Sequence, residues 1–203
     1  VFGVLFGYVT TRRAGTTFAL ISLGIGEMVS ACVLMFPGFF GGEGGISIDR
    51  TAATPFFGLK FGPPIQVYYL VAAWCFACMA AMYGLTQTPL GRMANAVRDN
   101  PERAEFVGYN TQQVRFLQLA LSAFFAGVSG ALSCINFEIV SAENVGAARS
   151  GGVLIATFIG GAGFFFGPIL GAIVFALMVT AVGTVTKAWL LYLGLLFLAM
   201  VLY

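Results

Sequence analysis

Long apolar runs alternate with short polar stretches along almost the whole chain. Three runs, 17–36, 67–87 and 114–135, are each long enough as helices to cross the roughly 30 Å hydrocarbon core of a bilayer. Three shorter apolar runs cover 151–159, 168–186 and 188–203. The pattern predicts an all-α, polytopic integral membrane bundle with about six membrane segments.

The start of the chain is apolar but covers only half a span. It predicts the end of a helix that begins upstream, so we expect this chain to be a fragment of a longer protein. Arg12 and Arg13 follow at once, and paired arginines beside a span favour the cytoplasmic side. In that orientation residues 37–66 and 136–150 lie outside, and 90–113 lies inside the cell. We expect residues 1–203 to form a single transmembrane domain.

Charge is concentrated in residues 90–113. The whole chain has ten basic and eight acidic residues. Six of them lie here: Arg92, Arg98, Asp99, Glu102, Arg103 and Glu105. Pro89 is expected to close the preceding span, because proline removes a helix hydrogen bond. The pattern of residues 91–97 then predicts a short helix.

Capping signals predict a second short helix in this stretch. Asn100 suits the N-cap and Pro101 the first helical position, and Gly108 is placed to end the helix in a left-handed conformation. Asn110, with Gln113 three residues later, predicts the cap of the next span. The result is a rigid helix-turn-helix at the membrane surface, typical of an element that docks a partner. The alternative is a solvated connecting loop.

Glu27 is the only charged residue in the run 17–36. A carboxylate near the middle of a bilayer is costly, so it needs polar surroundings. Glu27 either faces a polar cavity on a transport path or ties its helix to a neighbour, and both interpretations stay open.

Glycine-rich stretches predict turns and close helix contacts. Residues 41–45 surround Glu43 with glycines after a membrane helix, which favours a tight turn over a phosphate cradle. Residues 160–168 predict a sharp turn before a helix that starts at Pro168 and runs to about 186. Whether 151–166 crosses the membrane fully or is re-entrant is left open. Small residues spaced four apart predict close packing between helices. The alternative is that they have no packing role. The positions concerned are Gly127, Gly163, Gly167 and Gly171.

Composition excludes several classes of function. Hydrophobic residues make up 59% and charged residues 9%, whereas soluble domains carry about 25% charged residues. Without histidine or a P-loop motif, the chain has no His-dependent nucleophile and no ATP site of its own. A net charge of +2 gives no basic patch for nucleic acid. Cys75 and Cys78 have a metal-like spacing but no second pair, so buried apolar packing is favoured and no metal or cofactor is expected.

Four motifs in order resemble the permease subunits of branched-chain amino-acid ABC importers, the M-type subunit in particular. The most specific is Gly91-Arg92-x-x-x-Ala96-x-Arg98-Asp99-Asn100-Pro101-x-x-Ala104-x-x-x-Gly108-x-Asn110. Similar stretches are 15–28, Ser141-Ala142-Glu143 and 159–172, and together they cover nearly the whole chain. The chain departs from the family pattern at Ala142, where the family usually has proline, and at Glu43.

The resemblance implies a multi-pass permease of the bacterial inner membrane. Its expected partners are two cytoplasmic ABC ATPases, a second related permease subunit, a periplasmic solute-binding protein and the lipid bilayer. The ATPases would grip a coupling loop, 90–113, through Arg92, Ala96, Arg98, Asp99, Asn100, Pro101, Arg103, Ala104, Gly108 and Asn110. Candidate contacts for the binding protein are Glu43, Glu138 and Glu143, and Glu27 is the candidate on the translocation path.

Other functions remain as alternatives. Permeases for urea, amides or small carboxylates look alike, and Glu43 lies on the face where solute arrives. A channel or secondary transporter would more often carry several charged residues at depth, and here only Glu27 qualifies. A membrane enzyme would need a nucleophile or metal cluster, which the missing histidines argue against.

Overall fold

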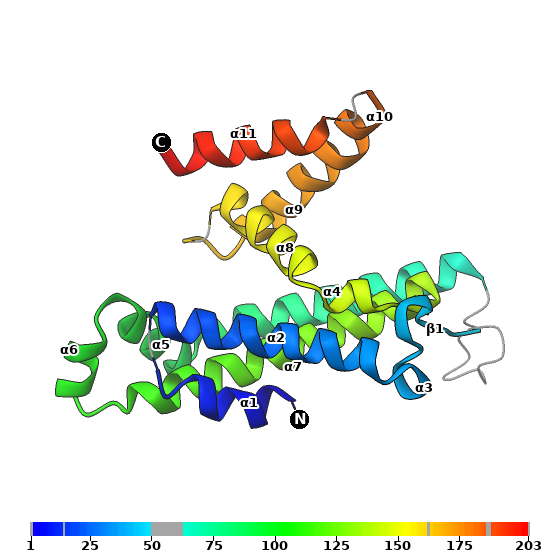
Figure 1. The fold of residues 1–203 in the computed structure, drawn as a ribbon. Helices are drawn as coiled ribbons and strands as arrows, with labels where there is room; N and C mark the ends of the chain where they lie inside the picture. Colours follow the sequence, from blue (N-terminus) through cyan, green and yellow to red (C-terminus); the bar gives the residue numbers. More distant parts are fainter. Residues whose placement is uncertain (1, 14, 50–62, 162, 186–187, 203) are drawn as a thin grey trace. The chain divides into compact units, whose positions relative to one another are not determined.

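The described chain is almost entirely helical, as the sequence predicts (Figure 1). The structure is a computed structural model and describes residues 2–13, 15–49, 63–161, 163–185 and 188–202. These residues form two compact units, Val1–Ala142 and Glu143–Tyr203. The single transmembrane domain expected from the sequence stays a prediction.

Three helices of the first unit are long and apolar enough to cross a membrane. Among the described residues these helices are α2 (Thr16–Met35), α4 (Pro64–Gln87) and α7 (Thr111–Phe137). All three were predicted within three residues at either end. The early start of α4 has a local cause, because Pro64 suits the first turn of a helix. α4 packs against α7 (Figure 1).

Helix α1 (Phe2–Thr10) packs against α7 through small residues. A β-carbon added to Gly3 would collide with that of Ala123, and one added to Gly7 would lie 2.7 Å from Leu119 Cδ2. The close approach therefore needs glycine in α1 and a small residue at Ala123. Beside Gly127 no described atom lies within 4 Å of an added β-carbon, so its packing role stays a prediction.

A small sheet joins the loop after α2 to the end of α7. The loop contains α3 (Pro37–Phe40), the 3-10 turn η1 (Gly42–Gly44) and β1 (Ile46–Ser47), which pairs antiparallel with β2 (Ile139–Val140). Gly45 has φ +68, and a β-carbon there would collide with the Val140 carbonyl. The strands approach closely because this position is glycine.

The second unit is a series of shorter helices. They are η3 (Ala142–Val145), which begins in the first unit, α8 (Ala147–Gly160), α9 (Gly167–Leu177), the π-helical η4 (Met178–Val182), α10 (Gly183–Val185) and α11 (Trp189–Leu202). The expected start of α8 at residue 151 is wrong by four residues, since the alanines at 147 and 148 are strong helix formers. α8 is about 21 Å long, shorter than the hydrocarbon core, so full crossing or re-entry stays a prediction.

The predicted glycine turn brings α8 and α9 into close contact. A β-carbon on Gly171 would fall on the Ala156 carbonyl oxygen, and one on Gly160 would fall on the Gly167 carbonyl. Gly163 lies in the turn itself, with no described atom within 4 Å of an added β-carbon. The helix expected from Pro168 starts at Gly167 and is interrupted by η4, where the Thr180 hydroxyl donates to the Ala176 carbonyl at 2.8 Å.

Candidate functional site

The polar stretch between α4 and α7 folds into two short helices, α5 (Pro89–Asp99) and α6 (Pro101–Phe106). We name residues 89–110 the charged hairpin. Pro89 follows the end of α4, as expected, and also begins α5, which makes α5 longer than predicted. A β-carbon on Gly91 would lie 2.5 Å from the Thr86 carbonyl oxygen. Glycine at this position therefore lets α5 turn tightly against the last turn of α4.

The predicted N-caps at Asn100 and Asn110 and the left-handed Gly108 are present. Asn100 Oδ1 accepts a hydrogen bond from Arg103 N at 3.1 Å, and Asn110 Oδ1 accepts one from Gln113 N at the same distance. Gly108 has φ +93, and its N–H donates to the Glu105 carbonyl at 2.8 Å. Each side-chain cap contributes about 1 kcal/mol, so the ends of α6 and the start of α7 are held by local bonds.

A small apolar core holds the charged hairpin together. It consists of Ala94, Val97, Ala104 and Val114, with Met93 packed against it. Ala104 is 5% exposed. In addition, the Thr111 hydroxyl donates to Glu105 Oε1 at 2.7 Å, which joins α6 to the first residue of α7. Burial and hydrogen bonding hold the charged hairpin against the start of α7. The close approach at Gly91 holds it against the end of α4.

The charged side chains lie on the outside of this core. Arg92, Asp99, Glu102 and Arg103 are exposed, and so is Ala96. Arg98 Nε donates to Asp99 Oδ1 at 3.0 Å, with the two side chains 66% and 67% exposed. An ion pair this exposed contributes little to stability, so both groups can exchange partners at low cost.

The structure places the predicted docking residues in two groups. The charged residues and Ala96 are accessible to a partner, whereas Ala104 lies inside and supports the fold of the charged hairpin instead. Asn100, Gly108 and Asn110 are exposed, but their visible role is to cap and end helices.

An exposed apolar edge was not predicted. Phe106 is 88% exposed and Val107 is 74% exposed, and Tyr109 beside them is also exposed. We name these three residues the apolar edge. A signal was present in the sequence, because an apolar pair stands directly before Gly108 in an otherwise polar stretch. Exposed apolar side chains are common along the described chain, and these three differ in lying within the polar stretch between two spans.

The acidic candidates lie elsewhere. Glu27 is exposed on α2, and both of its expected roles stay predictions. Glu43 belongs to η1, and Glu138 is the left-handed C-cap of α7 with φ +58. The pairing of β1 with β2 brings these two segments to the same end of the first unit. Glu143 is exposed in η3 and belongs to the second unit.

Within the described ranges, no group of three or more His, Cys, Asp or Glu residues is placed to hold a metal ion. The four cysteines are free. Cys78 is half-buried, whereas Cys75 is exposed on α4 rather than packed inside the chain as expected.

Comparison with known proteins gives a match over the full length of the chain. Residues 1–203 match the family described as "Branched-chain amino acid transport system / permease component". The high-affinity branched-chain amino acid transport system permease protein LivM of Escherichia coli strain K12 is 30% identical over 192 residues, which cover 84% of this chain and 45% of LivM. LivM of Salmonella typhimurium strain LT2 is 28% identical with the same coverage. The chain therefore spans about half the length of these curated relatives. No solved structure matches.

Proposed function

The chain belongs to the family of permease components of branched-chain amino-acid transport systems, and from this premise we propose that it imports solute as part of a binding-protein-dependent ABC transporter. The family consists of transporter permease components, and the apolar helices suit a multi-pass membrane protein. In the proposal the chain acts as a transport subunit and not as an enzyme. In the proposal the chain lies in the bacterial inner membrane and pairs with a second related permease subunit. Two cytoplasmic ATPases supply the energy, and a periplasmic binding protein delivers the solute.

The observation that carries the proposal is the construction of the charged hairpin. Its core, its caps and the bond between Thr111 and Glu105 make it a preformed element rather than a loose linker. It is attached at both ends to apolar helices of membrane-spanning length, α4 and α7. A force applied to the charged hairpin is therefore passed directly to both helices.

The mechanism follows from this attachment. Closure of the ATPases on ATP would tilt the charged hairpin, and α4 and α7 would rock with it between two packed arrangements, opening the path first to one side and then to the other. Arg98, Asp99 and Arg103 would set the position of the charged hairpin by pairing with charges on the ATPase. Because exposed ion pairs are weak, the apolar edge would supply most of the binding energy.

The experiment compares two exposed phenylalanines. Phe106→Ser removes the centre of the apolar edge, whereas the control Phe39→Ser changes a residue that is 77% exposed in α3. We expect Phe106→Ser to reduce co-purification of the ATPases and to lower solute-stimulated ATP hydrolysis by roughly tenfold or more, because burial of a phenylalanine side chain contributes about 1.5–3 kcal/mol. Phe39→Ser should leave ATPase association unchanged. ATPase association that survives both Phe106→Ser and Val107→Ser would refute the docking role.

The solute is proposed to be a branched-chain or other amino acid, because the family and LivM carry that description. Urea, amides and small carboxylates remain the alternative solutes within the proposal. Uptake of labelled leucine by the reconstituted transporter, in competition with each alternative, decides between them. No uptake of labelled leucine, together with uptake of labelled urea by the same preparation, would reject the amino-acid assignment.

A further inference from the structure

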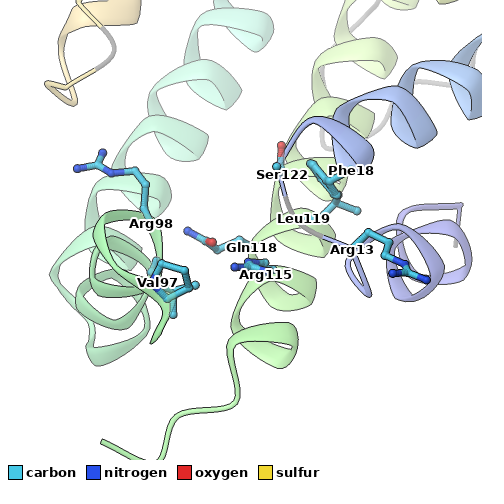
Figure 2. A pocket seen from close by; sticks show the side chains of 11 residues that line it. Arg13, Phe18, Val97, Arg98, Arg115, Gln118, Leu119 and Ser122 are labelled. Atoms are coloured by element: carbon cyan, nitrogen blue, oxygen red, sulfur yellow. The ribbon is translucent and has the colours of Figure 1, made fainter. Parts of the chain in front are cut away.

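A cavity opens where the charged hairpin meets the starts of α2 and α7 (Figure 2). Its volume is 660 Å³. Its walls come from α2 and the segment before it, from α5 and α6, and from α7. The lining includes three arginines, Arg13, Arg98 and Arg115, and no aspartate or glutamate. Three arginines without a carboxylate among the lining residues favour an anion over a cation as ligand.

The arginines surround the cavity from three different segments. Figure 2 shows Arg115 and Gln118 of α7 in the middle, with Arg98 on one side and Arg13 on the other. The terminal groups of Arg13 and Arg98 point outward in this conformer. Both residues are exposed, so their long side chains have room to turn inward. For Arg98 this breaks the pair with Asp99, which costs little because both side chains are exposed. Arg115 is half-buried and more firmly placed.

One wall of the cavity is apolar and continues along the spans. Phe18 lies in the first turn of α2, and Leu119 lies in the third turn of α7. The arginines lie at the ends of the same helices, since Arg13 precedes α2 and Arg115 is near the start of α7. When these helices span a bilayer, the arginines lie at the level of the lipid headgroups and the apolar wall faces the acyl chains.

We propose that this cavity binds the phosphate of an anionic phospholipid. Guanidinium groups present paired N–H donors that match phosphate oxygens, and Gln118 adds a neutral donor. The apolar wall would contact the upper part of an acyl chain, which a free phosphate ion lacks. The volume is within the usual range for small-ligand sites, about 300–1,000 Å³.

A lipid in this position would connect the charged hairpin to α2. Its phosphate would bridge Arg98 on α5 and Arg13 before α2, with Arg115 between them. The membrane would then take part in holding the charged hairpin in place. Arg98 is shared with the proposed ATPase contact, whereas Arg13 and Arg115 are not, so their part of the site stands whether or not the charged hairpin docks an ATPase.

The test measures lipid binding to the intact permease in detergent by native mass spectrometry. Phosphatidylglycerol is titrated against phosphatidylcholine of the same acyl chains, for the wild type and for Arg13→Gln and Arg115→Gln. An arginine near an anionic lipid surface contributes about 1 kcal/mol of binding free energy. Loss of either arginine should therefore weaken phosphatidylglycerol binding about fivefold. Phosphatidylcholine binding should be weaker from the outset and change less.

Arg12→Gln is the matched control. Arg12 has the same charge and adjoins Arg13, but its guanidinium lies 4.8 Å from the centre of the Tyr8 ring and bonds to the Tyr8 hydroxyl at 3.1 Å. It does not line the cavity, so its loss should leave phosphatidylglycerol binding unchanged.

Four results would overturn the proposal. They are equal binding of the two lipids, unchanged binding in both variants, an equal loss in Arg12→Gln, and displacement of phosphatidylglycerol by millimolar inorganic phosphate. The last result would assign the cavity to a free anion. Arg13 lies outside the helices and is exposed, so Arg13→Gln carries the test if Arg115→Gln fails to fold.

Discussion

Gly108 offers a direct test of how the charged hairpin is held. Its φ of +93 is a conformation that side chains with a β-carbon rarely adopt. No described atom lies within 4 Å of an added β-carbon, so Gly108→Ala introduces backbone strain without a collision. The expected cost is about 1–2 kcal/mol. Opening of the end of α6 should therefore become about 5–30 times more frequent.

Hydrogen–deuterium exchange of the purified permease measures this opening. The relevant amides are those of Gly108 and Tyr109, which donate to the carbonyls of Glu105 at 2.8 Å and Ala104 at 3.1 Å. Gly108→Asn is the matched control, because asparagine tolerates the left-handed region better than alanine. Exchange should rise strongly in Gly108→Ala and only weakly in Gly108→Asn. Equal exchange in the two variants would refute the conformational explanation.

Three further predictions concern the core, the glycine contact and the acid on α2. Ala104→Leu overfills the core of the charged hairpin, so we expect it to lose about 1–3 kcal/mol of folding stability, measured as faster limited proteolysis. Solute uptake should then be uncoupled from ATP hydrolysis. Unchanged transport with normal ATPase stimulation would contradict this. Gly171→Val should lower the thermal midpoint in detergent because α8 and α9 must separate, whereas Gly163→Val should not; equal midpoints would remove the packing argument. Glu27→Gln should slow solute uptake if Glu27 lies on the path, and unchanged affinity and rate would leave it a structural tie.

The sequence predicted those features that depend on neighbours along the chain. The caps at Asn100 and Asn110 and the left-handed Gly108 each use groups within a few residues, so residue type and spacing are sufficient. The membrane spans could be predicted equally well, because a long apolar run is recognised without knowing which helices pack against it.

Features that depend on distant contacts could not be predicted. Strands β1 and β2 are two residues each and more than 90 positions apart, too short to carry a periodic pattern. Ala104 looked like a surface residue because its burial depends on Val114, which lies beyond the turn at Gly108. The exposure of Phe106 was missed for the opposite reason, since an apolar residue is expected to find cover.

The pairing of β1 with β2 has a mechanical consequence. Helix α7 is a rod about 40 Å long, and a tilt of 10° about its hairpin end would displace its far end by about 7 Å. The pairing and the bond from Ile48 N to the Glu138 carbonyl, at 2.8 Å, would carry the segment around Glu43 along with it. A chemical event on one side of the bilayer would thus be felt as a change of shape on the other, without any signal passing through the lipid between.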